Sequence, residues 1–510
     1  MNAAITQTNA SKRQKVRAEL EKATNIDSKI EDKAAEIEET AKVIIEKPDH
    51  HPVLKKMLAS ITDKLTDDEF RNISGNSLTT NPGRSDYYIG VIEKVLEKAR
   101  SLKLGLCGDA VENSQNIYCY TGEYWQRLTE GQLRFFLQDC AEKLGVSKYA
   151  KDHKFVESLY KQFLSQAYPP VVAERDPNKI LINLMNGTFE ISTESPEGRL
   201  RPFQSKDFLK YQMPFKYDPS ATCSMWQNFL DEMQPDEKRE GQRLLAEVMA
   251  FPLVYFKIEK AIFMYGTGAN GKGVYYEIQR RLYGKENVSD CSLTNLKQEY
   301  YLSDLNGKLV NYSSELGSAG MIESDLFKQL ASREPVKARQ KYGKSFTMYD
   351  YARLIFNANE LPSAPEMTTA FFRRFLIIPW EVTQPENKQD VELPEKIAAS
   401  ELPGIFNWTL QGLKRLVAQK RFSECEASAK ALDRYKQDSD NTAQFLDDCG
   451  YEDSPDAWTD LKTLHREYTE YCRDSGYKPL GRNKFSQRLE RNKHLSKHID
   501  NKRGFCLGKK

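Results

Sequence analysis

The chain has 510 residues, of which 75 are Lys or Arg and 73 are Asp or Glu. This length allows about three or four domains, each able to bury its own core. Hydrophobic residues (39%) are too frequent, and the charges too balanced, for a globally disordered chain. The net charge alone predicts no partner, so any basic surface must be local.

Nine cysteines are scattered along the chain without a C-x-x-C pair and without pairing to the six histidines. An odd number of cysteines without a regular disulfide or metal-ligand spacing is typical of a protein in a reducing cytosol and disfavours a zinc site. The most apolar stretch, 244–256, is short and carries Glu247, and the N-terminus lacks the apolar core of a signal peptide. We therefore expect a soluble, cytoplasmic protein with no membrane partner.

Residues 1–103 are rich in Lys, Glu and Asp and poor in aromatic side chains. Isolated apolar residues amid charge at 28–47 predict a solvated helix or a short coiled coil. This part is interpreted as a charged helical extension or a small docking module.

Residues 104–240 have a different character. Alternating β-formers around Thr121-Gly122 predict a hairpin over 116–128, and helices are expected over 130–144 and 153–166. A second hairpin is predicted over 179–191, where the chain turns at Asn186-Gly187. Residues 221–256 are expected to be mostly helical. We interpret 104–240 as an α+β domain.

Short apolar strands alternate with helices from 260 to 379, an order that predicts an α/β sheet with ligands at the strand carboxyl ends. We assign 241–385 to this core. Prolines at 385, 394 and 403 predict a linker or extended loop over 384–404, and an amphipathic helix follows over 405–418. Together, 386–441 are interpreted as a linker and helical segment.

The last part, 442–510, is predicted to be a separate small domain. A helix is expected over 458–474, a second over 483–491, and strands over 495–507 around a turn at Asp500-Asn501. Helix, turn, helix and β-wing are the elements of a winged helix. The predicted fold class is therefore multidomain α/β and α+β, with a P-loop ATPase core between an α+β domain and a winged helix.

A glycine-rich loop follows the predicted strand 261–265 and opens a helix at 274. Its glycines let successive N–H groups point at phosphate oxygens, and its lysine supplies a charge for the β- and γ-phosphates of ATP. The residues predicted to bind the nucleotide are Gly266, Thr267, Gly268, Ala269, Asn270, Gly271, Lys272 and Gly273. Position 273 is normally Ser or Thr, whose hydroxyl holds Mg²⁺, so here water, nucleotide and acidic residues would hold the metal.

Two further strand ends carry polar residues. Glu315 ends the strand at 308–315, 43 residues after Lys272, where an acid can polarise the attacking water and order Mg²⁺. Asn359 follows the strand at 353–358 and is our choice for the residue that orients this water, with Asn357 in reserve. The structural alternatives are that Glu315 is simply solvated and that the Asn359 amide only forms hydrogen bonds within a turn.

Arg373 and Arg374 precede the apolar strand that begins at 375. Twin arginines here could form a structural ion pair. The functional interpretation is an arginine finger that reaches the γ-phosphate in a neighbouring subunit. The sequence leaves open which of the two would act.

Two basic segments are candidates for DNA binding. The first is a hairpin expected around a Tyr-Gly turn, with cations suited to a phosphodiester backbone: Lys337, Arg339, Lys341 and Lys344. The second is the C-terminal segment 482–510, with ten Lys or Arg against two acids. There the recognition helix and wing would present Arg482, Lys484, Arg488, Lys502 and Arg503. The alternatives to DNA binding are that these cations are simply solvated, or that the C-terminal domain docks onto a protein.

Taken together, these motifs resemble the superfamily 3 helicases, and more closely the helicase half of phage, plasmid and poxvirus-type primase–helicases. The residues that carry the resemblance are MYGTGANGKG (264–273), YSSEL (312–316), ANELP (358–362) and FFRRFLIIPW (371–380). Upstream, YTGEYW (120–125), MNGTFEI (185–191) and 214–230 resemble the preceding domain, and 458–508 the terminal winged helix. The resemblance covers about 110–510.

The resemblance implies an AAA+-like core in a ring, usually a homo-hexamer, with ATP and Mg²⁺ between subunits. Lys272, Glu315 and Asn359 would act from one subunit, and Arg373 or Arg374 from the next. The hairpin would track single-stranded DNA from 3′ to 5′ at a fork. Residues 1–100 lack the acids and histidine of a primase domain, so we expect a separate primase partner in the replication of a phage or other mobile element.

Two other functions stay open. One is a DNA-binding ATP switch or loader that assembles at an origin without processive unwinding, which Gly273 and the lone Glu315 favour. The other is a nucleotide-dependent defence or chaperone-like machine, whose ATPase would be indifferent to DNA.

Overall fold

The computed structural model describes residues 50–509 apart from 77–80, 110–115, 168–178, 193–194, 315–323, 342, 344, 363, 365–366 and 478, and of residue 388 only the backbone. The helix predicted over 28–47, Glu315 and Lys344 lie outside this part. The chain divides into two units, Met1–Asp63 and Lys64–Lys510. In the described part of the first, α2 (Pro52–Ser60) begins with proline, whose missing N–H costs nothing there. Within the described residues, no helix has the length and apolar character needed to cross a membrane.

The second unit begins with a small α+β module, in which the predicted first hairpin and both predicted helices are found. Its elements are α3 (Asp67–Ser74), α4 (Arg84–Ser101), β1 (Gly105–Asp109), β2 (Asn116–Tyr120), β3 (Trp125–Leu128), α5 (Glu130–Lys143), α6 (Ser147–Ala150) and α7 (His153–Gln166). The strands form an antiparallel sheet in the order β1-β2-β3. Helix α4 packs against β1, α5 and α7, so these contacts cross the predicted boundary at 103/104.

A second antiparallel sheet, β4-β5-β6, follows and contains the second predicted hairpin. It leads through a short 3₁₀ turn into two helices that cover the central sheet. The elements are β4 (Lys179–Leu184), β5 (Gly187–Ser192), β6 (Arg199–Arg201), η1 (Ser205–Asp207), α8 (Ser224–Met233), α9 (Glu240–Ala250) and η2 (Phe251–Leu253).

The central sheet has five parallel strands in the order β13-β7-β12-β9-β8. Its strands are β7 (Ala261–Tyr265), β8 (Val288–Ser289), β9 (Val310–Ser313), β12 (Arg353–Ala358) and β13 (Phe375–Pro379). The interleaved elements are α10 (Lys272–Tyr283), η3 (Lys285–Asn287), η4 (Asn295–Lys297), α11 (Glu299–Leu302), η5 (Ser303–Leu305), α12 (Ser324–Ser332), β10 (Val336–Arg339), β11 (Ser345–Met348) and α13 (Thr369–Phe372). The predicted α/β sheet is therefore present.

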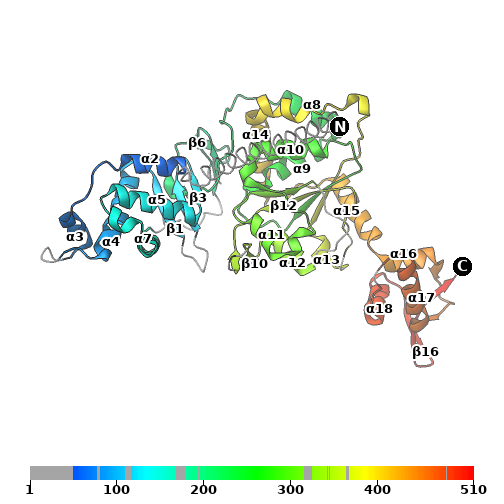
Figure 1. The fold of residues 1–510 in the computed structure, drawn as a ribbon. Helices are drawn as coiled ribbons and strands as arrows, with labels where there is room; N and C mark the ends of the chain where they lie inside the picture. Colours follow the sequence, from blue (N-terminus) through cyan, green and yellow to red (C-terminus); the bar gives the residue numbers. More distant parts are fainter. Residues whose placement is uncertain are drawn as a thin grey trace, which may run out of the picture. The chain divides into compact units, whose positions relative to one another are not determined.

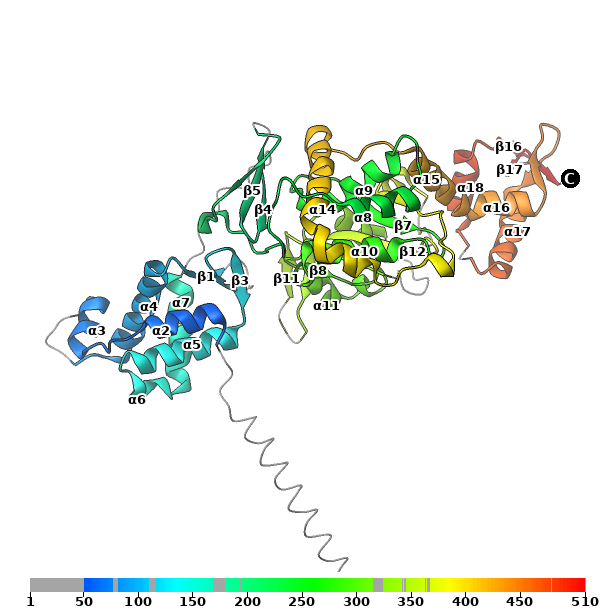
Figure 2. The ribbon, with the colours of Figure 1, turned by 90° about the horizontal axis from the view of Figure 1, so that it is seen from above.

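Helices cover both faces of this sheet, which explains why its strands are apolar on both sides. Successive side chains of β7 point to opposite faces. Ile262 and Met264 join the core beneath α8, α9, α10 and α14, whereas Ala261 and Phe263 join the core beside α12, α13 and α15. Figures 1 and 2 show the first group of helices on one face, and Figure 1 shows α11, α12 and α13 on the other.

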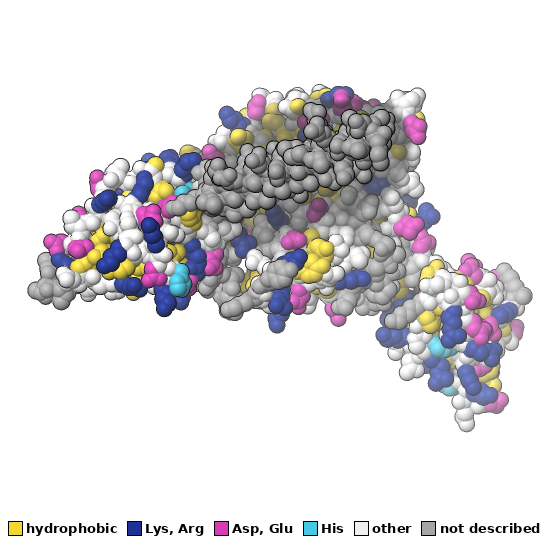
Figure 3. All heavy atoms as spheres, in the orientation of Figure 1, with side chains coloured by type: hydrophobic (Ala, Val, Ile, Leu, Met, Phe, Trp, Pro, Cys, Tyr) yellow, Lys and Arg dark blue, Asp and Glu magenta, His cyan; other side chains and the backbone are white. Residues whose placement is uncertain are grey.

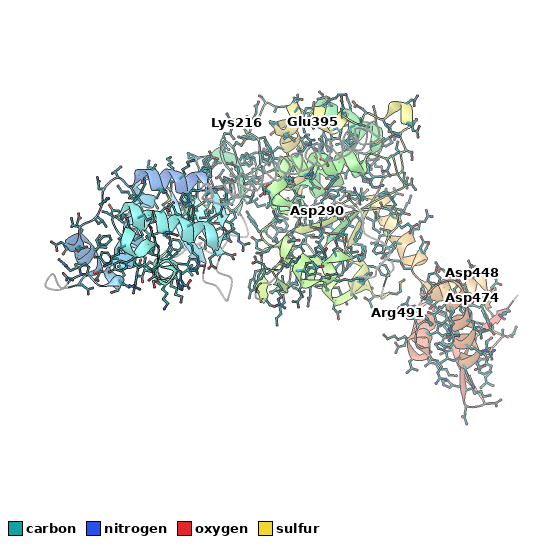
Figure 4. All side chains as sticks on the ribbon, viewed as in Figure 1. Lys216, Asp290, Glu395, Asp448, Asp474 and Arg491 are labelled. Atoms are coloured by element: carbon teal, nitrogen blue, oxygen red, sulfur yellow. The ribbon has the colours of Figure 1, made fainter. Side chains whose placement is uncertain are left out.

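The predicted linker over 384–404 is partly wrong. After η6 (Glu386–Lys388), the single helix α14 (Leu393–Gln419) includes both Pro394 and Pro403. Pro394 lies in the first turn, where no N–H is needed. Glu395, which lies in the same turn and is labelled in Figure 4, pairs with Arg281 of α10 at 2.6 Å.

Helix α15 (Glu426–Asp438) leads into a C-terminal domain with its own core. The elements are α16 (Asn441–Asp448), β14 (Tyr451–Asp453), β15 (Thr459–Asp460), α17 (Leu461–Asp474), α18 (Arg482–Arg491), β16 (Ser496–Ile499), β17 (Lys502–Phe505) and β18 (Leu507–Lys509). Helix α17 begins three residues later than predicted because Asp460 caps it, accepting bonds from the N–H groups of Lys462 and Thr463. The predicted turn at Asp500-Asn501 joins β16 to β17, with both residues at positive φ.

Candidate nucleotide site and nucleic-acid surfaces

The phosphate loop joins the carboxyl end of β7 to the first turn of α10. Gly271 adopts φ +83°, and a Cβ added there would lie 2.8 Å from the sulfur of Met233, so both the backbone and the space require glycine. Asn270 is buried, and its amide donates to the carbonyl oxygen of Trp380 at 3.0 Å. The loop is thereby fixed to the end of β13, with the N-terminus of α10 directed at its interior.

Lys272 lies inside this loop. Its ammonium group donates to the carbonyl oxygens of Gly266 (2.5 Å) and Thr267 (3.1 Å) and to Oδ1 of Asn270 (2.9 Å). Burial lowers the pKa of Lys272 from 10.5 to about 8. The side chain is thus held as a positive charge among neutral oxygens, where anionic phosphate oxygens would be stronger partners.

A cleft of about 400 Å³ opens beside the loop, at the carboxyl edge of the sheet. Besides 268–274, its wall includes Ser314 from the end of β9 and Asn357 and Asn359 from the end of β12. Asn357 is buried and accepts a hydrogen bond from the Tyr312 hydroxyl at 2.9 Å, whereas Asn359 is exposed. The structure therefore places Lys272 and both asparagines around one cleft. Glu315, directly after Ser314, lies outside the described residues.

Sequence reasoning missed the opposite wall of the cleft. It is formed by Phe229, Glu232 and Met233 of α8 and by residues between β13 and α14, among them Gln384, Asp390 and Val391. The backbone N–H of Gln384 donates to the carbonyl oxygen of Ala269 at 2.8 Å, which ties this segment to the phosphate loop. No motif marks these residues, because they come from two distant segments that meet only in the fold.

The cleft offers donors for a nucleotide phosphate and for a Mg²⁺ ion bound to it. Among the described residues, no three His, Cys, Asp or Glu side chains are grouped so that they could hold an ion. The oxygen donors that line the cleft include the Ser314 hydroxyl, the carboxylates of Glu232 and Asp390, and amide oxygens of asparagine and glutamine side chains. Mg²⁺ keeps several waters and needs only one or two carboxylates besides phosphate oxygens, so this donor set fits a nucleotide-bound Mg²⁺.

Arg373 and Arg374 lie at the amino edge of the sheet, and neither lines the cleft in its own chain. The five residues of β13 separate them from the phosphate loop by about 16 Å. Arg374 is buried: its Nε donates to the Ser332 hydroxyl at 3.2 Å, and its guanidinium also donates to the carbonyl oxygen of Ala370. Arg373 is 57% exposed and donates to Glu259 at 2.8 Å.

The predicted basic hairpin is present as the antiparallel pair β10–β11. Lys337 and Arg339 are exposed and alternate with the buried Val336 and Ala338, so one face carries the cations and the other joins the core. Lys341, in the turn, is exposed as well. Lys344 lies outside the described residues.

The C-terminal cations divide into two groups. Arg482, Lys484 and Lys502 are exposed, and lysine and arginine side chains form several patches on the visible face of this domain in Figure 3. Arg488, by contrast, is only 10% exposed and pairs with Asp440 at 3.4 Å. Arg503 pairs with Glu490. The predicted DNA contact of Arg488 would therefore require this buried pair to open.

Three protein families match separate parts of the chain. Residues 105–235 match the D5 N terminal like family, and residues 437–506 match the Poxvirus D5 protein-like family. Residues 264–374, which hold the phosphate loop, both asparagines and both arginines, match a family of unknown function, DUF5906.

Several solved structures are similar to the chain at low identity. The A form apo structure of the NrS-1 C terminal region is 14% identical, covers 81% of this chain and 98% of that one, and has a TM-score of 0.45. The apo structure of the same region is 12% identical, with the same coverage and a TM-score of 0.43. Likeness at this level does not define a function, and no curated protein matches the sequence. The D5-type domains on both sides of the phosphate-loop segment relate the chain to the D5-like primase–helicases.

Proposed function

We propose that the protein is an ATP-dependent, ring-forming replicative DNA helicase of superfamily 3, which translocates on single-stranded DNA from 3′ to 5′ and unwinds duplex. The observation that carries this proposal is the cleft in which Lys272, Asn357 and Asn359 converge at the carboxyl edge of a parallel sheet. The D5-type domains that flank this core support a function in replication.

Each residue proposed for the cleft would have a separate role in ATP hydrolysis. The N–H groups of the phosphate loop and the ammonium of Lys272 would hold the β- and γ-phosphates of ATP. Asn359, which is exposed at the strand end, would orient the attacking water, while Asn357 is already engaged by Tyr312. Glu315 would polarise that water. Mg²⁺ bound between phosphates would neutralise charge that develops on them.

A second subunit would complete the site. Because the arginines lie at the far edge of their own sheet, only a neighbouring copy could bring one of them to the γ-phosphate, as in a ring, for which we propose a homo-hexamer. Arg373 is the better candidate for the finger, since Arg374 is buried among partners of its own chain. The exposed cations of the β10–β11 hairpin and of a C-terminal winged helix would contact DNA, and a separate primase would act with the ring.

One observation favours a second function, an ATP switch or loader without processive unwinding. Gly273 has no side-chain hydroxyl to offer to Mg²⁺. Weak metal ligation would slow turnover while leaving nucleotide binding intact.

Unwinding of a forked duplex with ATP and Mg²⁺ separates the two functions, with DNA-stimulated ATPase measured in parallel. The helicase requires strand separation that Lys272→Ala abolishes. Binding of ATP and DNA without strand separation, on forks with either tail, would instead establish the switch or loader. An ATPase that DNA does not stimulate, in a protein that binds no DNA, would reject both.

A further inference from the structure

We infer that a second cleft, at the amino edge of the central sheet, binds single-stranded DNA. The inference rests on the proposed function and adds a site that the sequence motifs do not mark. This cleft has a volume of about 650 Å³ and is far from the nucleotide cleft, since the two lie at opposite ends of the parallel strands. We call it the amino-edge cleft.

The walls of the amino-edge cleft come from two domains. One wall is the β2–β3 hairpin, with Tyr118, Tyr124 and Arg127; the other is formed by 284–287 and 306–308, the loops that precede β8 and β9. The intervening segment at 210–214 joins them. Gln212 donates from its side chain to Glu123 at 2.7 Å, and its carbonyl oxygen accepts a bond from the Asn287 amide at 3.1 Å. These two hydrogen bonds connect the 210–214 segment to both walls of the cleft.

The charge of the lining favours a polyanion. Its basic side chains are Arg127, Lys210, Lys285 and Lys308, and Glu286 is the acidic one. Arg127 and Lys285 are exposed. Cations spaced along a groove neutralise successive phosphates and displace their counterions, which is the main source of affinity for nucleic acid.

The lining also offers surfaces for bases. Tyr124 is half-buried on one wall, and Met185, 47% exposed, lies on the same lining. The ammonium of Lys210 lies 4.6 Å from the centroid of the buried Tyr118 ring, which holds this cation at the lining, so Tyr124 is the aromatic ring that a base could reach. Bases stack on such aromatic side chains without sequence preference, while amides such as Gln126 and Asn306 can bond their edges.

The amino-edge cleft adjoins the basic hairpin. Asn306, in its wall, forms a β-bridge with Tyr351, and the N–H of Gly307 donates to the carbonyl oxygen of Asp350 at 3.2 Å. Tyr351 lies three residues after β11, and between them Tyr349 is 62% exposed. A single-stranded DNA bound by the β10–β11 hairpin would therefore pass the exposed Tyr349 and reach the amino-edge cleft along one edge of the sheet.

The test is binding of a fluorescein-labelled dT20 to the full chain, measured by anisotropy over a range of salt concentrations. We expect Arg127→Glu/Lys285→Glu to weaken binding at least tenfold and to reduce the slope of log K against log salt by roughly 1.4, at 0.7 per lost contact. Lys151→Glu/Lys154→Glu, which reverses two exposed cations outside the cleft, should bind like the wild type. Thermal unfolding checks the fold, and Arg127→Gln/Lys285→Gln replaces the reversal variant should that one fail to fold.

Stacking is tested separately. Tyr124→Leu should weaken dT20 binding by about 5- to 150-fold, whereas Tyr124→Phe, which keeps the ring, should stay within about twofold of the wild type. The amino-edge cleft would be overturned if Arg127→Glu/Lys285→Glu and Tyr124→Leu both bound dT20 with wild-type affinity while the hairpin variant Lys337→Ala/Arg339→Ala lost binding. That result would leave the proposed helicase function intact. A wild-type protein that binds no single-stranded DNA would remove both.

Discussion

The buried ammonium of Lys272 should make nucleotide binding depend on pH in a range where an ordinary lysine gives no effect. Its pKa of about 8 means that about nine-tenths of the chains carry the charge at pH 7, half at pH 8 and about one-tenth at pH 9. Phosphate binds the charged form, so affinity is greatest below pH 8 and falls as pH rises. From pH 7 to pH 9 the Kd for ADP should rise about tenfold, or about 1.4 kcal/mol.

Fluorescence titration with a labelled ADP at pH 7, 8 and 9 measures this change. Lys272→Ala is the control: it should bind weakly and equally at all three values. The hydrogen bond from Lys396 lowers the pKa of Asp390, another residue of the cleft wall, so the charge of this carboxylate does not change between pH 7 and pH 9. Lys260 is another lysine whose pKa burial lowers, but it lies at the opposite end of β7 and donates to the Phe375 carbonyl oxygen. A wild-type Kd that stays constant from pH 7 to pH 9, or a slope that survives in Lys272→Ala, would refute the reasoning.

Three further predictions concern residues that the structure distinguishes. Gly273→Ser should lower the Mg²⁺ concentration needed for half-maximal ATPase, because a Cβ there meets nothing within 4 Å; an unchanged Mg²⁺ curve would exclude a metal beside this position. Arg373→Ala should cut turnover by about 10³- to 10⁵-fold with an unchanged Tm, and Arg374→Ala should instead destabilise the fold by about 2–4 kcal/mol, measured by denaturant unfolding. The reverse pattern would make Arg374 the finger. Lys337→Ala/Arg339→Ala should abolish DNA stimulation but spare DNA-free ATPase, and stimulation that persists would exclude the hairpin.

Elements with strong local signals were predictable from the sequence. The hairpins at 116–128 and 179–191 and the strand–loop–helix around Lys272 depend on short-range patterns, and the structure has all three. The start of α14 was not predictable in this way, because Pro394 and Pro403 suggested a break. Tertiary contacts override that signal: the buried carboxylate of Glu401 accepts bonds from the N–H groups that open α8.

The candidate site shows the same limit. Spacing along the chain brought Lys272 and Asn359 together, because both follow strands of one parallel sheet. It could not distinguish Arg373 from Arg374, since their difference lies in Ser332, which is 42 residues away in sequence. Nor could it show that Arg488 faces Asp440 rather than solvent, because that pair joins residues 48 positions apart.

Helix α14 also bears on protein engineering. Replacing helical glycines by alanine is a common route to higher thermal stability, worth about 0.5–1 kcal/mol at a compatible position. At Gly404 and Gly412 a Cβ would lie 2.1 Å and 2.2 Å from the backbone oxygens of Thr222 and Ala246. A saturation-mutagenesis map should therefore show two intolerant positions on one face of α14, eight residues apart, where helix propensity recommends alanine. Gly131 of α5 and Gly273 of α10, where a Cβ would meet nothing within 4 Å, should by contrast accept a side chain.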